Sequence, residues 1–163
     1  EQLYRDNRIT PIYEGTNSVQ AADLVFRKLI NKNGDIIDRY LEMIKRECDT
    51  KDVKIKPFIK ELKHHLEIMS DFTNWIKEKL KNSKDDASAA CNDYLKALGF
   101  VSLGYSWVKV LEVSFKDYHN NKKFYEEKIQ TANFYFKRVL IRAEGHFKAA
   151  TTGSDYIMNF NFN

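Results

Sequence analysis

Residues 87–115, ASAACNDYLKALGFVSLGYSWVKVLEVSF, contain the most regular hydrophobic pattern in the chain. Apolar side chains recur at alternating intervals of four and three residues, at Ala87, Cys91, Tyr94, Leu98, Val101, Tyr105 and Val108, and continue to Leu111 and Phe115. This spacing follows one face of an α-helix, which turns every 3.6 residues. The stretch therefore predicts a single long helix that buries one face.

The flanking sequence repeats this pattern, which sets the fold class. Helical spacing covers residues 57–82 and 125–150, and a shorter pattern runs from residue 35 to about 48. Strand-like alternation competes nowhere. Three helices of about 25–35 residues with short connections must pack antiparallel. The sequence predicts an all-α, up-and-down antiparallel bundle of four helices.

Composition supports a single helical core. The 163 residues include only 6 Gly and 2 Pro, which argues against a turn-rich β-sandwich or a disordered tail. The longest stretch without a charge, Ala97 to Val108, is too short for a membrane span. Cys48 and Cys91 match no CxxC pattern, so we expect reduced, buried thiols in a cytoplasmic protein.

Two kinds of binding site are disfavoured. His64 and His65 are neighbours and point about 100° apart on a helix, so we expect no metal site there. Residues 122–125 and 134–138 mix basic and aromatic side chains, as nucleic-acid platforms do. Because Tyr125 and Phe136 lie on the predicted core stripe and the net charge is only +4, we expect no nucleic-acid partner.

The N-terminal part differs from the rest. Residues 1–16 contain Thr10-Pro11 and Gly15, which favour a loop, and a helix is expected to begin near Asn17 or Ser18. Its predicted apolar face is Val19, Ala22, Phe26 and Leu29, and it ends at residues 31–34. We therefore divide the chain at residues 1–33 and 34–163. The tail from Thr151 is apolar enough that we expect it to dock on the bundle.

Residues 4–20 stand out chemically. They present one carboxylate, Glu14, directly before Gly15 and a helix N-terminus. Glycine permits close approach of a ligand to the backbone, and the amides of Thr16 to Ser18 could hold an anion or a polar cofactor group. A polar loop with Glu14 as a favourable acid near the first helical turn explains the same pattern without any ligand.

This segment resembles the C-terminal catalytic stretch of the flavin-dependent acyl-CoA dehydrogenases, YRDxRI followed by IYEGT and a glutamine four residues on. The matching residues are Tyr4-Arg5-Asp6, Arg8-Ile9, Ile12 to Thr16 and Gln20. The resemblance implies that Glu14 is the catalytic base, that Gly15 lies against the acyl-CoA, and that Thr16, Asn17 and Ser18 contact FAD.

The residues after this segment resemble the branch of that family with an added C-terminal helical domain, which includes enzymes acting on methylthiopropanoyl-CoA. The match lies in residues 124–142 and in the tail at 153–158. The resemblance implies that such an enzyme also has an N-terminal helical domain, a β-domain and most of a flavin-binding bundle, which these 163 residues do not include. We therefore expect FAD to bind the intact parent and not this fragment.

The implied activity is α,β-dehydrogenation of an acyl-CoA thioester in fatty acid metabolism. The implied partners are an acyl-CoA substrate, electron-transfer flavoprotein as acceptor, and further copies in a dimer or tetramer. Two alternatives stay open: a helical interaction or oligomerisation module without activity of its own, and an acyl-CoA oxidase. Thr16 favours the dehydrogenase, since the familiar oxidases carry an acid at that position.

Overall fold

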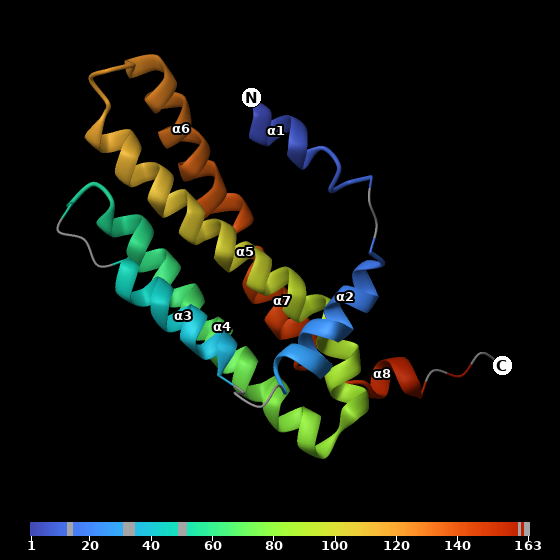
Figure 1. Cartoon of the computed structure of the whole chain (residues 1–163). Coiled ribbons are helices and arrows are strands. Elements are labelled where there is room, and N and C mark those ends of the chain that lie inside the picture. Colours follow the sequence, from blue (N-terminus) through green and yellow to red (C-terminus); the bar gives the residue numbers. More distant parts are fainter. Residues whose placement is uncertain (13–14, 31–34, 49–51, 160, 162–163) are drawn as a thin grey trace.

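The computed structural model describes residues 1–12, 15–30, 35–48, 52–159 and 161, and every regular element in these residues is helical (Figure 1). The elements are α1 (Gln2–Asn7), α2 (Asn17–Asp23), the π-helical turn η1 (Leu24–Lys28), α3 (Ile36–Glu47), α4 (Lys56–Asn82), α5 (Lys84–Lys116), α6 (Lys122–Phe134), the π-helical turn η2 (Tyr135–Val139), α7 (Arg142–Ala150) and α8 (Asp155–Met158). The predicted all-α class is confirmed.

Helix α5 is the centre of the bundle. It packs against α4, α6 and α7 and also contacts α2, while α3 packs against α4. Figure 1 shows α3, α4, α5 and α6 running side by side in an up-and-down arrangement. The chain therefore forms the antiparallel bundle that its long apolar stripes predict.

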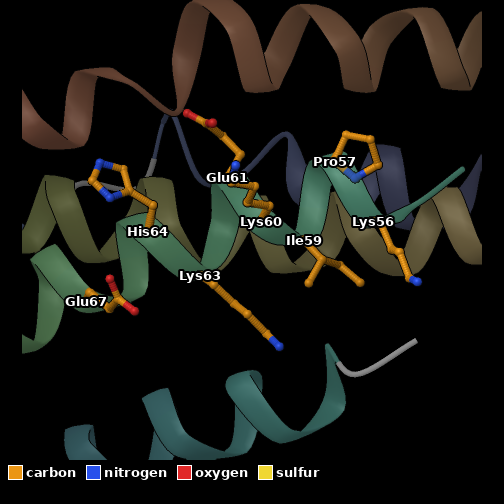
Figure 2. Close-up of a pocket in the computed structure, with 8 residues that line it drawn as sticks. All are labelled: Lys56, Pro57, Ile59, Lys60, Glu61, Lys63, His64 and Glu67. Carbon is orange, nitrogen blue, oxygen red and sulfur yellow. The ribbon is translucent and has the colours of Figure 1, made fainter. Parts of the chain in front are cut away.

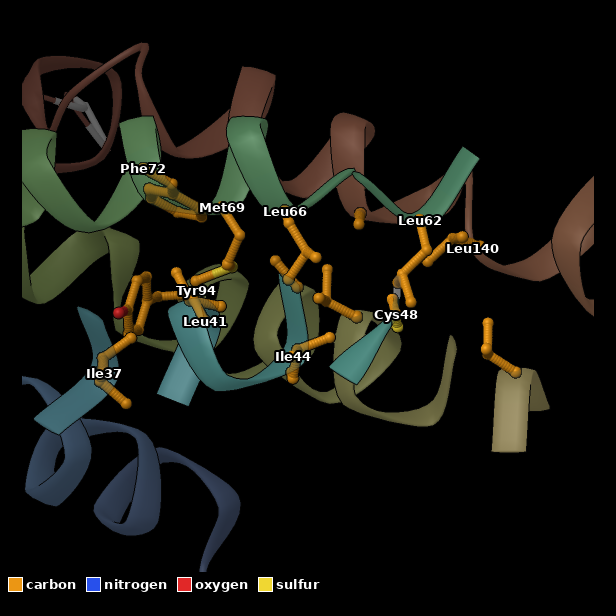
Figure 3. Close-up of a cluster of buried hydrophobic side chains, with 14 of the residues drawn as sticks. Ile37, Leu41, Ile44, Cys48, Leu62, Leu66, Met69, Phe72, Tyr94 and Leu140 are labelled. Carbon is orange, nitrogen blue, oxygen red and sulfur yellow. The ribbon is translucent and has the colours of Figure 1, made fainter. Parts of the chain in front are cut away.

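The core is apolar and continuous across the helices (Figure 3). Large side chains such as Leu66 and Phe72 of α4 are fully buried, and both free cysteines are buried. The same cluster includes Ala21, Val25 and Leu29, so α2 and η1 share the core of the bundle. The division at residue 33 stays a prediction.

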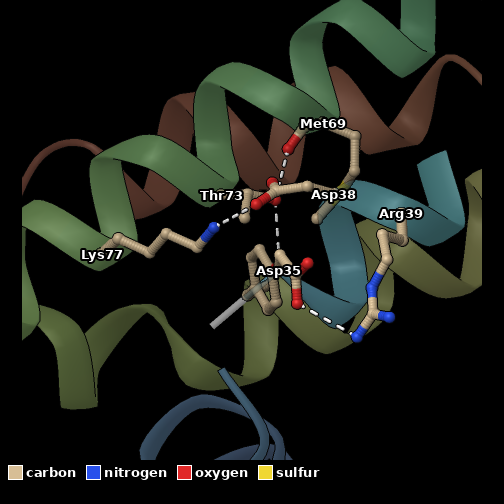
Figure 4. Close-up of polar contacts among 7 residues, drawn as sticks. Asp35, Asp38, Arg39, Met69, Thr73 and Lys77 are labelled. Atoms are coloured by element: carbon tan, nitrogen blue, oxygen red, sulfur yellow. Dashed lines mark hydrogen bonds and ion pairs between the residues drawn. The ribbon is translucent and has the colours of Figure 1, made fainter. Parts of the chain in front are cut away.

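A few polar contacts are built into this core (Figure 4). The Thr73 hydroxyl donates to the Met69 carbonyl at 2.7 Å, and the Tyr94 hydroxyl lies 2.9 Å from Thr73 Oγ1. Since Thr73 has one hydroxyl proton, Tyr94 is the donor in the second bond. Burial raises the pKa of the Tyr94 phenol. At the edge of the core, Lys77 Nζ lies 2.5 Å from Asp38 Oδ2 and joins α4 to α3.

The last long pattern differs from the single helix expected over residues 125–150. Most of its apolar stripe is buried, with Tyr125, Ile129 and Phe147 partly buried, but the helix passes through η2, turns at Leu140 and Ile141, and restarts as α7. A π-helical turn accommodates one additional residue. In this turn the Tyr135 hydroxyl donates to the Phe100 carbonyl of α5 at 2.7 Å, which fixes the turn against the bundle.

The N-terminal segment is not entirely the predicted loop, because α1 forms within it. The pairs Arg5–Glu1 and Gln2–Asp6, each four residues apart, stabilise a single helical stretch locally. Leu3 is 86% exposed, so no part of the described chain covers this helix.

Among residues 151–158 of the tail, the docked part is the beginning. Ser154 donates to Asp86 Oδ1 from both its backbone N–H and its hydroxyl, each at 2.8 Å, and Lys79 approaches the other carboxylate oxygen at 2.9 Å. Beyond this point Tyr156 is 83% exposed, and Ile157 and Met158 are also exposed. The expectation that the apolar tail docks is therefore wrong for α8, which is too short to press an apolar face on the bundle. Phe160 and Phe162 lie outside the described residues.

Candidate functional site

The predicted site residues lie around the N-terminus of α2. Gly15 and Thr16 directly precede the helix, and Asn17 and Ser18 are its first two residues. All four are exposed. Glu14, the predicted catalytic base, lies outside the described residues.

The hydrogen bonds of α2 begin at the Thr16 carbonyl. The Thr16 carbonyl accepts from the N–H groups of Val19 at 2.8 Å and Gln20 at 3.1 Å. The Gln20 side chain folds back toward Gly15, where a Cβ atom would lie 2.8 Å from its Nε2. Gly15 therefore leaves room for a close neighbour, and the first backbone N–H groups of the helix have no partner within it. Together with the hydroxyl and amide side chains, this donor set fits an anionic group such as the diphosphate of FAD.

The bundle anchors this site. Ala21 and Val25 are fully buried, and α2 contacts α5. Across that contact Asn92 Nδ2 donates to Ser18 Oγ at 3.4 Å. Sequence reasoning missed Asn92, because it is an exposed residue of α5 that belongs to no motif and is 74 positions from Ser18.

A pocket of about 960 Å³ lies along the first half of α4 (Figure 2). Figure 2 shows Glu61 and His64 extending from one side of the helix and Lys63 from the other. Its lining mixes lysines and glutamates that do not converge on one point, so we assign no chemistry to it.

Two histidines meet one carboxylate next to this pocket. His64 Nε2 and His65 Nε2 each lie 3.6 Å from Glu144 Oε1, although we expected neighbouring histidines to diverge. His65 is buried, its Nδ1 lies 2.9 Å from the Glu61 carbonyl, and its Nε2 has no hydrogen-bond partner. In the described part of the chain no three His, Cys, Asp or Glu side chains are arranged to hold a metal ion.

Other charged groups have structural partners. The Tyr105 hydroxyl donates to Glu47, which lowers the pKa of Glu47 and raises the pKa of Tyr105 to about 12. Burial raises the pKa of the Cys48 thiol to about 11, so this thiol is not activated as a nucleophile. Within the described residues, no helix has the length and apolarity needed to cross a membrane.

Comparison with known proteins gives two matches. Residues 40–161 match the family described as acetyl-CoA dehydrogenase C-terminal like. A stretch of 43 residues is 54% identical to 3-methylmercaptopropionyl-CoA dehydrogenase of Ruegeria pomeroyi, covering 26% of this chain and 7% of that protein. The chain therefore matches only a small part of the length of this relative. The family match begins after the site at residues 14–18.

Proposed function

Because this chain belongs to the acetyl-CoA dehydrogenase C-terminal-like family, we propose that it is the C-terminal part of a flavin-dependent acyl-CoA dehydrogenase. The reaction is α,β-dehydrogenation of an acyl-CoA thioester. The observation that carries the proposal is the position of the segment at residues 4–20, which ends on a helix anchored to a bundle of this family.

Glu14 is the proposed base, and it accepts the proton from the α-carbon of the thioester. A carboxylate suits this task in a closed active site, where loss of water raises its basicity. Gly15 allows the acyl group to lie close to the backbone beside Glu14. When bound, FAD would supply the oxidising chemistry, as acceptor of the β-hydrogen.

Thr16, Asn17 and Ser18 are the proposed FAD contacts. Their support is the donor set at the start of α2 and the anchoring of this helix through Ser18 and Asn92. These residues form one loop of a larger site, so the chain alone would hold the cofactor weakly. We expect the 163-residue chain to lose FAD on gel filtration.

The remaining partners follow from the same proposal. The substrate is an acyl-CoA, and the name of the Ruegeria relative supports a methylmercaptopropionyl thioester as a candidate. Electron-transfer flavoprotein is the proposed acceptor, and the intact enzyme is a dimer or tetramer.

The test is Glu14→Gln in the full-length enzyme. Glutamine keeps the shape of the side chain but has no basic oxygen, so the rate of flavin bleaching by substrate should fall by at least ~10²–10⁴, with FAD content and acyl-CoA affinity retained. Glu67→Gln, an exposed change on α4, is the control and should bleach normally. Near-normal bleaching in Glu14→Gln would place the base elsewhere in the enzyme.

Two other functions give different results in the same assays. A helical interaction module without activity would show no bleaching in any variant of a full-length protein that contains FAD. An oxidase would pass electrons directly to oxygen, so stopped-flow mixing of the reduced enzyme with oxygen would reoxidise the flavin rapidly without electron-transfer flavoprotein.

A further inference from the structure

A second candidate binding surface lies between α5 and α6, at the end of the bundle away from α2 (Figure 1). It is a groove of about 420 Å³ whose walls are mainly Trp107, Val110 and Val113 of α5 and Phe124 and Tyr125 of α6. Val113 is 50% exposed and Phe124 is 46% exposed, so the groove presents apolar side chains to solvent. The volume is within the range of small-molecule sites.

The charges at this groove are unequal. Lys109 Nζ lies 3.3 Å from Glu112 Oε2 and 3.7 Å from Glu47 Oε2, so carboxylates of the bundle already compensate it. Lys128 Nζ lies 5.1 Å from the centre of the Phe124 ring and makes no ion pair within the described residues. One positive charge therefore remains uncompensated beside an apolar surface.

Besides the lysines, Trp107 and Tyr125 bring an indole N–H and a phenol hydroxyl to the lining, and the hydroxyl of Ser114 is already used. The Ser114 hydroxyl donates to the Val110 carbonyl at 2.7 Å. A ligand of this groove thus meets mainly apolar and aromatic side chains, and Lys128 is the lining cation that no carboxylate of the described residues compensates. A nucleotide diphosphate fits this groove poorly, because its charge would require several uncompensated cations. A protein partner also fits poorly, because a stable interface buries about 800 Å² on each partner, far more surface than this groove has.

We propose that this groove binds a free fatty acid, with the unbranched chain along α5 and α6 and the carboxylate at Lys128. The site is separate from Gly15 and Thr16, and the proposal does not depend on the dehydrogenase reaction. Because carboxylate and alkyl chain are recognised by different side chains, each contribution can be tested by itself.

The first experiment titrates sodium dodecanoate, below its micelle concentration, into the full chain carrying Trp75→Phe. Trp107 is then the remaining tryptophan, and its emission should change saturably with one ligand bound. Across hexanoate, octanoate, decanoate and dodecanoate, each added methylene should tighten binding about twofold to fourfold. The absence of saturation, or affinity independent of chain length, would overturn the proposal.

The second experiment tests the charge. Lys128→Met keeps an apolar stem on Phe124 and should weaken dodecanoate binding about threefold to tenfold, while the binding of neutral dodecanol stays unchanged. Lys123→Met, an exposed change on the same helix, is the matched control and should have no effect. Equal effects of the two substitutions, equal binding of dodecyltrimethylammonium, or binding only to anionic vesicles would each refute the assignment.

Discussion

The two glycines of α5 test how closely the helices approach. At Gly104 a Cβ atom would lie 3.1 Å from Leu62 Cδ1 and 3.4 Å from Leu140 Cδ1, whereas at Gly99 no atom lies within 4 Å. Gly104 is buried and Gly99 is exposed. Replacement by alanine therefore changes helix propensity at both positions but changes packing at only one.

The magnitudes follow from that difference. Gly99→Ala should stabilise the chain by about 0.8–1.0 kcal/mol, since alanine favours the helix interior by that amount. Gly104→Ala gains the same propensity, but its Cβ atom pushes two fully buried leucines, and overpacking costs about 1–3 kcal/mol. Gly104→Ala should therefore be less stable than Gly99→Ala by about 1–3 kcal/mol.

Urea unfolding followed by circular dichroism measures this difference, provided the two variants have equal dependence on urea concentration. Leu62→Val in the Gly104→Ala background should recover part of the packing loss, which a double-mutant cycle isolates. Equal stabilisation by Gly99→Ala and Gly104→Ala would show that α5 does not approach Leu62 this closely.

Two further predictions concern buried or partly buried polar groups. Asp86→Asn should lower the thermal midpoint at pH 7, because Lys79 and then Ser154 hold the pKa of Asp86 well below its usual value. That stabilisation is complete above the unfolded pKa of about 3.9 and is lost as the pH falls below it. The difference in thermal midpoint between Asp86→Asn and the unaltered chain should therefore be smaller below pH 4 than at pH 7. A difference that does not change with pH would contradict this account. Glu144→Gln should stabilise the chain by about 0.5–1.5 kcal/mol in urea, since an amide N–H can donate to the unpartnered His65 Nε2. Destabilisation would show that His65 carries its proton on Nε2.

The sequence was sufficient to predict the long helices α4 and α5 and the bundle they form, but not α1 or the division of the last pattern into α6, η2 and α7, and it placed two core positions one residue away. Leu98 and Tyr105 were expected on the buried face of α5, and both are only partly buried. The neighbouring residues Ala97 and Gly104 are buried in their place. A hydrophobic pattern identifies core positions by their large apolar side chains. Where two helices approach most closely, however, only the smallest side chains fit, so the pattern does not identify the residues at the centre of a tight interface.

The contacts that join distant elements could not be predicted in the same way. The motif at residues 4–20 is local, and its residues can be read in order along the chain. The bond between Asn92 and Ser18, and the approach of Glu144 to His65, depend on how helices pack after they form. No spacing rule relates the partners of either pair.

The anchoring of α2 connects the bundle to the proposed chemistry. The expected face of this helix included Val19, but Val19 is exposed, and the buried positions are Ala21, Val25 and Leu29. These three residues pack in the hydrophobic core around α5. The bundle therefore fixes both the depth of α2 and its rotation about its own axis. Rotation of a helix moves the groups at its N-terminus with it. The bundle therefore determines where Thr16 and Ser18 present their donors, and it supports the proposed site as a scaffold.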